Sequence, residues 1–324
     1  MSTPTPEQIV AAFLERIGSG ALDDVRKMLE VVPTLVNAKG AHPFWGGRPQ
    51  PLHVAIEGGR PAIFTLLLDS GADVNGSNDE YDLWSPLMLT IDRENTAFRE
   101  ELLRRGARIG LLEALMLADD ARVAELLSDG VLPAIAPNRG SILAFARTPF
   151  AIDRLIELGA DTQMKDRWGS SPIDAMSRLG KRGQALVRHL IAHGVEAAPK
   201  EYARLGDLET LQRMIANDAS IAQRDDVMMG AVDFAHHSLV EWLLAHGGNV
   251  NARTDWQSKQ TALHSAAWNG DLEMVKLLLA HGADPLARDA EYDATPQGWA
   301  ETAIIVANNP KCAAVAEYLR TLGQ

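Results

Sequence analysis

Carboxylates beside large aromatic rings are the residues of this sequence best able to do chemistry. Phe, Trp and Tyr make up 6% of the 324 residues, yet they gather in short polar stretches in which an Asp stands nearby. A carboxylate with a raised pKa in an enclosed, aromatic-walled pocket can act as a general acid or base on a small molecule. A ring beside it attracts cationic groups. The carboxylates of these stretches are Asp82, Asp166, Asp255 and Asp293.

The aromatic residues of these stretches are Trp45, Tyr81, Trp84, Trp168, Trp256 and Tyr292. The Asp, Asn, Ser and Gly residues around them are typical of turns, so we expect the rings at loop tips. A ring exposed at a loop tip leaves apolar surface in water unless something covers it. Two interpretations stay open. Each ring packs onto the neighbouring loop, or the rings contact a ligand or partner, since Trp and Tyr are favoured interface anchors.

Other catalytic or metal-binding patterns are weak. The nine His residues and one Cys include no H-E-x-x-H or C-x-x-C spacing, so we expect no metal site and no cofactor. No G-x-S-x-G nucleophile motif is present. RLGKRGQ (178–184) superficially suggests a phosphate-binding loop, but a turn between two helices is the better interpretation. Cys312 lies among Ala residues and is interpreted as a packing residue.

The composition, with 46% hydrophobic and 23% charged residues, is that of a globular protein. The 31 Lys and Arg residues against 43 Asp and Glu residues give a net charge of −12, which disfavours nucleic acids and anionic membranes as partners. A single Cys excludes an internal disulfide bond. The N-terminal residues lack a basic segment followed by an apolar core, and no run of about 18 apolar residues occurs. We therefore expect a cytoplasmic protein, and a monomer.

One phrase recurs along the chain: a leucine-rich helix end, a glycine, then a small or acidic residue. TLLLDSGADVN (65–75) and VKLLLAHGADP (275–285) are two clear copies. A glycine at this place adopts the left-handed conformation that ends a helix without a steric penalty. The glycines recur every 88 residues in two series, Gly71, Gly159 and Gly247, then Gly106, Gly194 and Gly282. This spacing indicates duplication of a block of three helical hairpins, which must stack to bury their apolar faces.

The stretch QTALHSAAWNGDLEMVKLLLAHGADPLARD (260–289) closely resembles the ankyrin repeat, whose pattern begins T-P-L-H-x-A-A and ends L-L-L-x-x-G-A-D. QPLHVAIEGGRPAIFTLLLDSGADVN (50–75) resembles it nearly as well, and looser copies extend the resemblance over almost the whole chain. The resemblance implies an all-α solenoid of helical hairpins with short β-turn fingers. The implied organisation is a single domain over 1–324, with an N-terminal capping unit at 1–40, repeat units at 41–309 and a C-terminal capping helix at 310–324.

The resemblance also assigns places to side chains. His53 and His264 occupy the family's histidine position, which is structural and hydrogen-bonds nearby backbone. Trp242 replaces a leucine of the pattern and is expected in the core. Gln297 stands where the pattern has leucine, either near a frayed edge of the stack or as an exception. The two residues after A-A point to the concave face, which by alignment holds Glu57, Asp92, Arg93, Phe145, Arg178, Arg204, Asp233, Phe234, Trp268 and Asn269.

Two functions are carried forward. The first is a binding scaffold that recognises a protein partner, or an apolar or cationic small molecule, through an aromatic- and carboxylate-rich concave face. The acidic balance favours a partner with a basic patch, and the lack of a catalytic motif favours this scaffold. The alternative is a metal-independent hydrolase, isomerase or lyase that uses general acid–base catalysis in the same groove. Residues that join the loop rings in binding are Phe145, Arg178, Phe234 and Trp268. Residues that join the loop carboxylates in catalysis are Asp92, Asp233 and Glu57.

Overall fold

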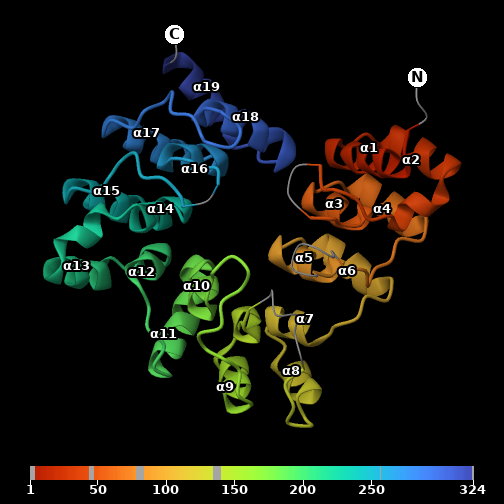
Figure 1. The fold of residues 1–324 in the computed structure, drawn as a ribbon, viewed down its shortest axis with the longest axis horizontal. Coiled ribbons are helices and arrows are strands. Elements are labelled where there is room, and N and C mark those ends of the chain that lie inside the picture. The colour runs from red at the N-terminus through yellow and green to blue at the C-terminus, as the bar shows by residue number, and fades with distance from the viewer. Residues whose placement is uncertain (1–3, 44–46, 78–83, 134–139, 256, 323–324) are drawn as a thin grey trace. The chain divides into compact units, whose positions relative to one another are not determined.

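The computed structural model describes residues 4–43, 47–77, 84–133, 140–255 and 257–322, which fold into helices joined by turns (Figure 1). Within these ranges the β-structure is one isolated antiparallel bridge between Arg253 and Thr261, at the base of a predicted finger. The predicted all-α hairpin architecture is thus confirmed. The chain divides into two compact units, Met1–Ala160 and Asp161–Gln324, and each is described by itself. A single domain over 1–324 stays a prediction.

The first unit is built of helix pairs in which a first, inner helix packs against a second, outer helix. The inner helices α1, α3, α5 and α7 contact one another in order, and each also contacts the outer helix of its own pair. The elements are α1 (Pro6–Ser19), α2 (Leu22–Val31), η1 (Pro33–Asn37), α3 (Pro51–Glu57), α4 (Pro61–Asp69), α5 (Pro86–Asp92), α6 (Thr96–Arg104), α7 (Leu111–Met116), α8 (Asp120–Leu126), η3 (Ile142–Phe145) and α9 (Pro149–Glu157).

The second unit repeats this arrangement. Its inner helices α10, α12, α14, α16 and α18 contact one another in order, which makes them a continuous row (Figure 1). The elements are α10 (Pro172–Ser177), η4 (Gly180–Gly183), α11 (Gln184–Ala192), α12 (Pro199–Leu205), α13 (Leu208–Asn217), η5 (Ala219–Gln223), α14 (Asp225–Asp233), α15 (His237–Ala245), α16 (Ala262–Asn269), α17 (Leu272–Ala280), α18 (Pro296–Val306) and α19 (Cys312–Leu322).

Several helices begin where the sequence supplies a capping side chain. The hydroxyl groups of Ser171 and Thr295 accept hydrogen bonds from backbone N–H groups at the starts of α10 and α18, and the Asp271 carboxylate does the same for α17. Such caps satisfy N–H groups that have no partner within the helix. Proline as the first residue of α10, α12 and α18 removes one of these unpaired groups altogether.

Six outer helices keep the 88-residue spacing of the sequence. α4, α9 and α15 begin at residues 61, 149 and 237, and α6, α11 and α17 begin at residues 96, 184 and 272. Each of the six has nine residues. Each is followed by one of the six predicted glycines, whose φ angles lie between 82° and 91°. The predicted left-handed capping role of these glycines is confirmed.

Replacing Gly282 by alanine tests the capping role. A Cβ atom at Gly282 would meet nothing within 4 Å, so the whole cost comes from placing alanine at a φ of 89°. We expect the free energy of unfolding to fall by about 1 kcal/mol. Gly298→Ala in α18 is the opposite control, because helical backbone there favours alanine and the new Cβ would make ordinary contacts. Urea denaturation followed by circular dichroism should give a lower free energy of unfolding for Gly282→Ala than for wild type. The value for Gly298→Ala should be equal to or higher than that of wild type.

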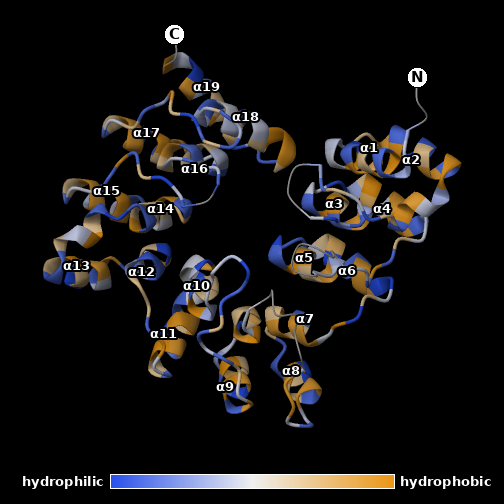
Figure 2. Ribbon diagram, in the orientation of Figure 1, coloured by the Kyte–Doolittle hydropathy of each residue, from blue (hydrophilic) through white to orange (hydrophobic). Residues whose placement is uncertain are grey.

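Each unit buries its own apolar core, and the apolar stretches of the helices appear orange in Figure 2. Phe13 and Phe64 are fully buried in the first unit, and Leu243 and Leu278 in the second. Trp242 lies half-buried against the second core and stacks on His246 with ring centroids 3.9 Å apart. Cys312 is buried, as expected of a packing residue. No described helix combines the length and apolar character needed to cross a membrane.

The two histidines of the family pattern are structural, as the resemblance implies. His53 and His264 are fully buried. The Nε2–H group of His53 donates to the carbonyl of Trp84 at 2.8 Å, and that of His264 donates to the carbonyl of Ala294 at 3.0 Å. Burial lowers the pKa of both rings, because it disfavours their charged form. Each neutral histidine therefore holds the finger that precedes the next inner helix.

Candidate interaction surface

A row of equivalent positions runs along the inner helices of the second unit. Each position lies two residues before a junction residue that has a positive φ angle. Because α10, α12, α14 and α16 pack in order, these positions follow one another across successive repeats. We call them the inner row, and they hold Arg178, Arg204, Asp233 and Trp268. All four belong to the concave-face residues predicted from the sequence.

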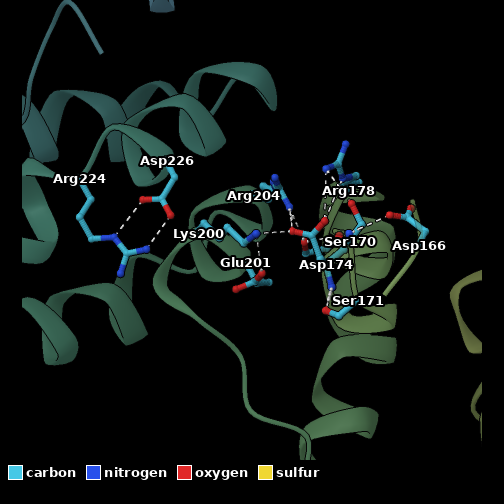
Figure 3. A network of polar contacts seen from close by, with 11 residues as sticks. Asp166, Ser170, Ser171, Asp174, Arg178, Lys200, Glu201, Arg204, Arg224 and Asp226 are labelled. Carbon is cyan, nitrogen blue, oxygen red and sulfur yellow. Dashed lines mark hydrogen bonds and ion pairs between the residues drawn. The ribbon is translucent and has the colours of Figure 1, made fainter. Parts of the chain in front are cut away.

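A buried carboxylate organises the first half of the inner row. The Asp174 side chain is 3% exposed and lies between three cationic side chains (Figure 3). Its oxygens are 2.6 Å from Arg204, 2.8 Å from Lys200 and 3.2 Å from Arg178. Because Lys200 and Arg204 come from α12, the network joins two adjacent repeats. Arg178 also donates to the hydroxyl of Ser170 at 3.3 Å.

The charges around Asp174 decide its protonation. Burial alone would raise the pKa of the Asp174 carboxyl, but the positive charges and hydrogen bonds of Arg204, Lys200 and Arg178 outweigh it. They hold the pKa well below its ordinary value, so Asp174 is charged at neutral pH. The two arginines of the inner row are in turn held in place by this carboxylate, since charge-assisted hydrogen bonds are the strong ones.

Glu201 adds a second buried carboxyl to the network, and its environment favours the charged form less than that of Asp174 does. Its carboxyl is buried, and one oxygen lies 3.7 Å from Lys200 Nζ. The other oxygen, Oε2, has no hydrogen-bond partner within the described part of the chain. Burial raises the pKa of Glu201, and the neighbouring Asp174 charge adds to the effect. Farther along, Arg224 and Asp226 form a separate, partly exposed ion pair at 2.6 Å (Figure 3).

Aromatic rings form the other half of the inner row. Trp268, half-buried at the end of α16, meets Trp299 of α18 edge to face, with centroids 5.7 Å apart. Trp299 also meets the His264 ring at 5.5 Å. Its indole N–H donates to the buried Asp289 carboxylate at 2.9 Å. The two indoles are therefore held in fixed positions by groups from three neighbouring segments.

Asp233 stands between the arginines and the aromatic rings. Its side chain is exposed, although the surrounding protein takes away part of its solvation and so raises the pKa of its carboxyl. A hydrogen bond with Ser265 and the charges of Arg204 and Arg178 act in the opposite direction and favour the carboxylate. Asn269 donates to the Asp233 carbonyl at 3.2 Å, which ties the ends of α14 and α16 together. Phe234 follows Asp233 and is half-buried beside Gly180.

The finger residues of the second unit lie in turns. Asp166 accepts hydrogen bonds from the backbone N–H groups of Trp168 and Ser170, so its carboxylate shapes its own turn. Trp168 is 49% exposed, with the Arg167 guanidinium 5.3 Å from its ring centroid. Asp255 is exposed. Asp293 is exposed and pairs with Arg288 at 3.1 Å, and Tyr292 is also exposed. Trp256 lies outside the described residues.

The candidates of the first unit are spread along it. Trp84 is half-buried against the core, and Phe145 is buried in η3. Glu57 lies 2.6 Å from the His42 ring, and both side chains are largely buried. Asp92 is exposed beside Arg93, and desolvation raises the pKa of its carboxyl. Trp45, Tyr81 and Asp82 lie outside the described residues.

Sequence reasoning missed the buried charges and one aromatic ring. Asp174 was missed, although it has the i, i+4 spacing of a helical ion pair with the predicted residue Arg178, a signal that could have found it. Alignment to the repeat placed Arg204 on the concave face, but Lys200 and Arg204 lie 26 and 30 residues beyond Asp174 in a repeat of different length, so no local pattern reveals their pairing with Asp174. Trp299 occupies the variable position x of the T-P-L-H-x-A-A pattern, directly after Gly298 at the histidine position, so the pattern gives it no predicted role. Gln297, left open above, is half-buried and donates to Glu301 at 2.9 Å.

Comparison with known proteins agrees with this arrangement. The family model described as ankyrin repeats (3 copies) matches residues 200–289, and the model for a single ankyrin repeat matches residues 50–79. The ankyrin repeat and KH domain-containing protein mask-1 of Caenorhabditis elegans is 26% identical over 251 residues, which are 74% of this chain and 9% of that protein.

Two further relatives match shorter parts. Alpha-latrotoxin-Lg1a of Latrodectus geometricus is 28% identical over 145 residues, which are 43% of this chain and 10% of the toxin. The B-cell lymphoma 3 protein homolog of Mus musculus is 28% identical over 161 residues, 45% of this chain and 36% of that protein. The chain thus spans about a tenth of the length of the first two relatives. The matched segments coincide with helix pairs of the described fold, and the chain is therefore an ankyrin-repeat protein.

Proposed function

We propose that the chain is a scaffold for protein–protein interaction that binds its partner with the inner row of its second unit. Ankyrin repeats and their relatives support a scaffold. One observation carries the choice of surface. Arg178, Arg204, Asp233 and Trp268 are large charged or aromatic residues at successive equivalent positions, and each is held by neighbouring groups. A surface already held in its binding geometry loses less entropy on association.

The mixture of residues suits a protein partner. Interfaces favour Trp and Arg as anchors, surrounded by groups that can be satisfied by hydrogen bonds. The half-buried rings of Phe234 and Trp268 are the aromatic anchors of the proposed surface, and Arg178 is its most exposed cation. We further propose that the protein is a cytoplasmic monomer.

Affinity capture with quantitative mass spectrometry tests this proposal. The test variant carries Phe234→Ala and Trp268→Ala. The control is Trp242→Ala, which removes another half-buried indole, from the outer helix α15. Circular dichroism confirms that both fold. We expect the partners captured by wild type and control to be lost from the test variant, because truncating an interface anchor typically costs about 2 kcal/mol or more. Equal capture by all three proteins would refute the proposed surface.

A further inference from the structure

We infer that the aromatic end of the inner row, formed by Asp233, Trp268 and Trp299, receives a lysine or arginine side chain of the partner. This inference rests on the proposed function and names the chemistry of its partner. We call this part of the surface the Asp233–Trp end. Its aromatic walls, its carboxylate and the charge of its surroundings each support a cationic occupant.

Contacts with neighbouring groups hold the aromatic walls in place, and the Trp268 ring meets that of Trp299 edge to face. Trp299 is fixed by its N–H bond to Asp289 and by the edge of His264. The backbone carbonyl of Trp268 accepts hydrogen bonds from Asn309 Nδ2 and Cys312 Sγ, both at 3.2 Å. Half-buried indoles in fixed positions present π-faces that do not have to be ordered on binding. Such a face attracts an ammonium or guanidinium group, and Trp is the best aromatic residue for this contact.

The carboxylate lies beside these walls. Asn269, which directly follows Trp268 on α16, donates through Nδ2 to the backbone carbonyl of Asp233 at 3.2 Å. The Ser265 side chain, three residues before Trp268 on α16, also lies close enough to the Asp233 carboxyl to favour its charged form. Because residues at this spacing are neighbours on one face of a helix, the Asp233 carboxyl and the Trp268 ring belong to the same patch. Arg204 and Arg178 both pair with Asp174, and neither forms an ion pair with Asp233 among the described residues. The exposed carboxylate can thus form an ion pair with an incoming cation.

The charge of the segment that carries the patch also favours a cation and outweighs in number the two nearby cations, Arg204 and Arg178, whose charges reach Asp233. Residues 225–324 contain 13 Asp and Glu residues against 6 Lys and Arg residues, so this segment carries more than its share of the net charge of −12. A surface with excess negative charge attracts basic partners and speeds their association. An apolar anchor would also fit the two indoles, but it would take solvent from the Asp233 carboxylate without compensating its charge.

Fluorescence anisotropy with labelled peptides tests the inference on the full chain. The probes are a flexible Gly-Ser peptide with three Arg residues, the same peptide with Lys, and matched peptides with Glu or Leu at these positions. The protein variants are Asp233→Asn, which removes the charge, and Trp268→Leu, which keeps apolar bulk but removes the π-face. Glu273→Gln and Trp242→Leu on the outer helices are the matched controls.

We expect wild type to prefer the Arg and Lys peptides over the Glu and Leu peptides. Each test variant should raise the Kd of a basic peptide by about three- to tenfold, and the controls should leave it within about twofold of wild type. Added salt should weaken the binding of the basic peptides. Unchanged Kd values in Asp233→Asn, a preference for the Glu or Leu peptides, or no binding of basic peptides by wild type would each overturn the inference.

The outcome is separable from that of the proposed function. If Phe234→Ala with Trp268→Ala abolishes partner capture while Asp233→Asn does not, the scaffold proposal stands and the cationic occupant is refuted. If basic peptides bind in the expected manner but capture does not depend on the inner row, the Asp233–Trp end is a cation-binding patch outside the main interface, and the proposed function fails.

Discussion

Replacing Leu278 by alanine is expected to lower the free energy of unfolding by about 2–5 kcal/mol. Leu278 is fully buried in α17, within the core of the second unit. The substitution removes apolar contacts and leaves a cavity that its neighbours fill only in part, and both effects destabilise a folded protein. Because repeats are stabilised by their neighbours, the loss should weaken the adjacent helix pairs as well.

Urea denaturation followed by circular dichroism measures this loss, and Leu286→Ala is the control. Leu286 is 65% exposed just beyond the same helix pair, so its truncation should change the free energy of unfolding by no more than about 0.5 kcal/mol. If the midpoint of urea denaturation of Leu278→Ala coincided with that of wild type, the assignment of Leu278 to the buried face of α17 would be wrong.

Replacing Asp174 by alanine is expected to cost about 3 kcal/mol of stability. The change leaves the mostly buried Arg204 guanidinium without its ion-pair partner, and breaking a buried pair by removing one member is strongly destabilising. Breaking a buried pair in this way typically costs about 3–5 kcal/mol. We expect a loss at the low end of this range because the side chains of Arg178 and Lys200 are partly exposed and can turn to solvent. Asp226→Ala, which breaks a more exposed pair with Arg224, should cost about 1 kcal/mol or less.

The Asp174 contribution should depend on pH in a defined direction. The pKa of Asp174 in the folded chain lies well below its ordinary value, which is about 3.9 in an unfolded chain. The stability contributed by Asp174 is therefore present above this value and is lost as pH falls through the folded-state pKa. The difference in free energy of unfolding between wild type and Asp174→Ala should be largest near neutral pH and shrink below about pH 4. A difference that grew in acid would contradict the described network.

Local rules made most of the fold predictable. A glycine after a leucine-rich helix end has one physical role, because only glycine takes the left-handed conformation without strain. Its recurrence every 88 residues therefore located α4, α9 and α15, and equally α6, α11 and α17. The same holds for His53 and His264, whose position in the T-P-L-H pattern implied the backbone contacts that the structure shows.

The candidate surface was predictable only in part. Alignment to the repeat located the four inner-row residues Arg178, Arg204, Asp233 and Trp268, because one position per inner helix faces the same side. It did not reveal Asp174 as the partner of Arg204, since this pairing crosses between repeats of unequal length. Finger conformations were also beyond local rules: Asp166 turned out to shape its own turn, a role that depends on the path of a few loop residues rather than on periodicity.

The shared carboxylate of Asp174 divides the inner row into residues with unequal freedom to evolve. Arg178 and Arg204 both pair with the buried Asp174 carboxylate. Losing either arginine leaves this carboxylate with fewer positive partners and therefore lowers the stability of the fold. Asp233 and Trp268 belong to the Asp233–Trp end of the row. Neither is among the described ion-pair partners of Asp174, and the Trp268 ring contacts Trp299 instead. New binding preferences can therefore arise by single changes at the Asp233–Trp end, whereas changes in the arginine half carry a cost in folding stability whatever the partner is.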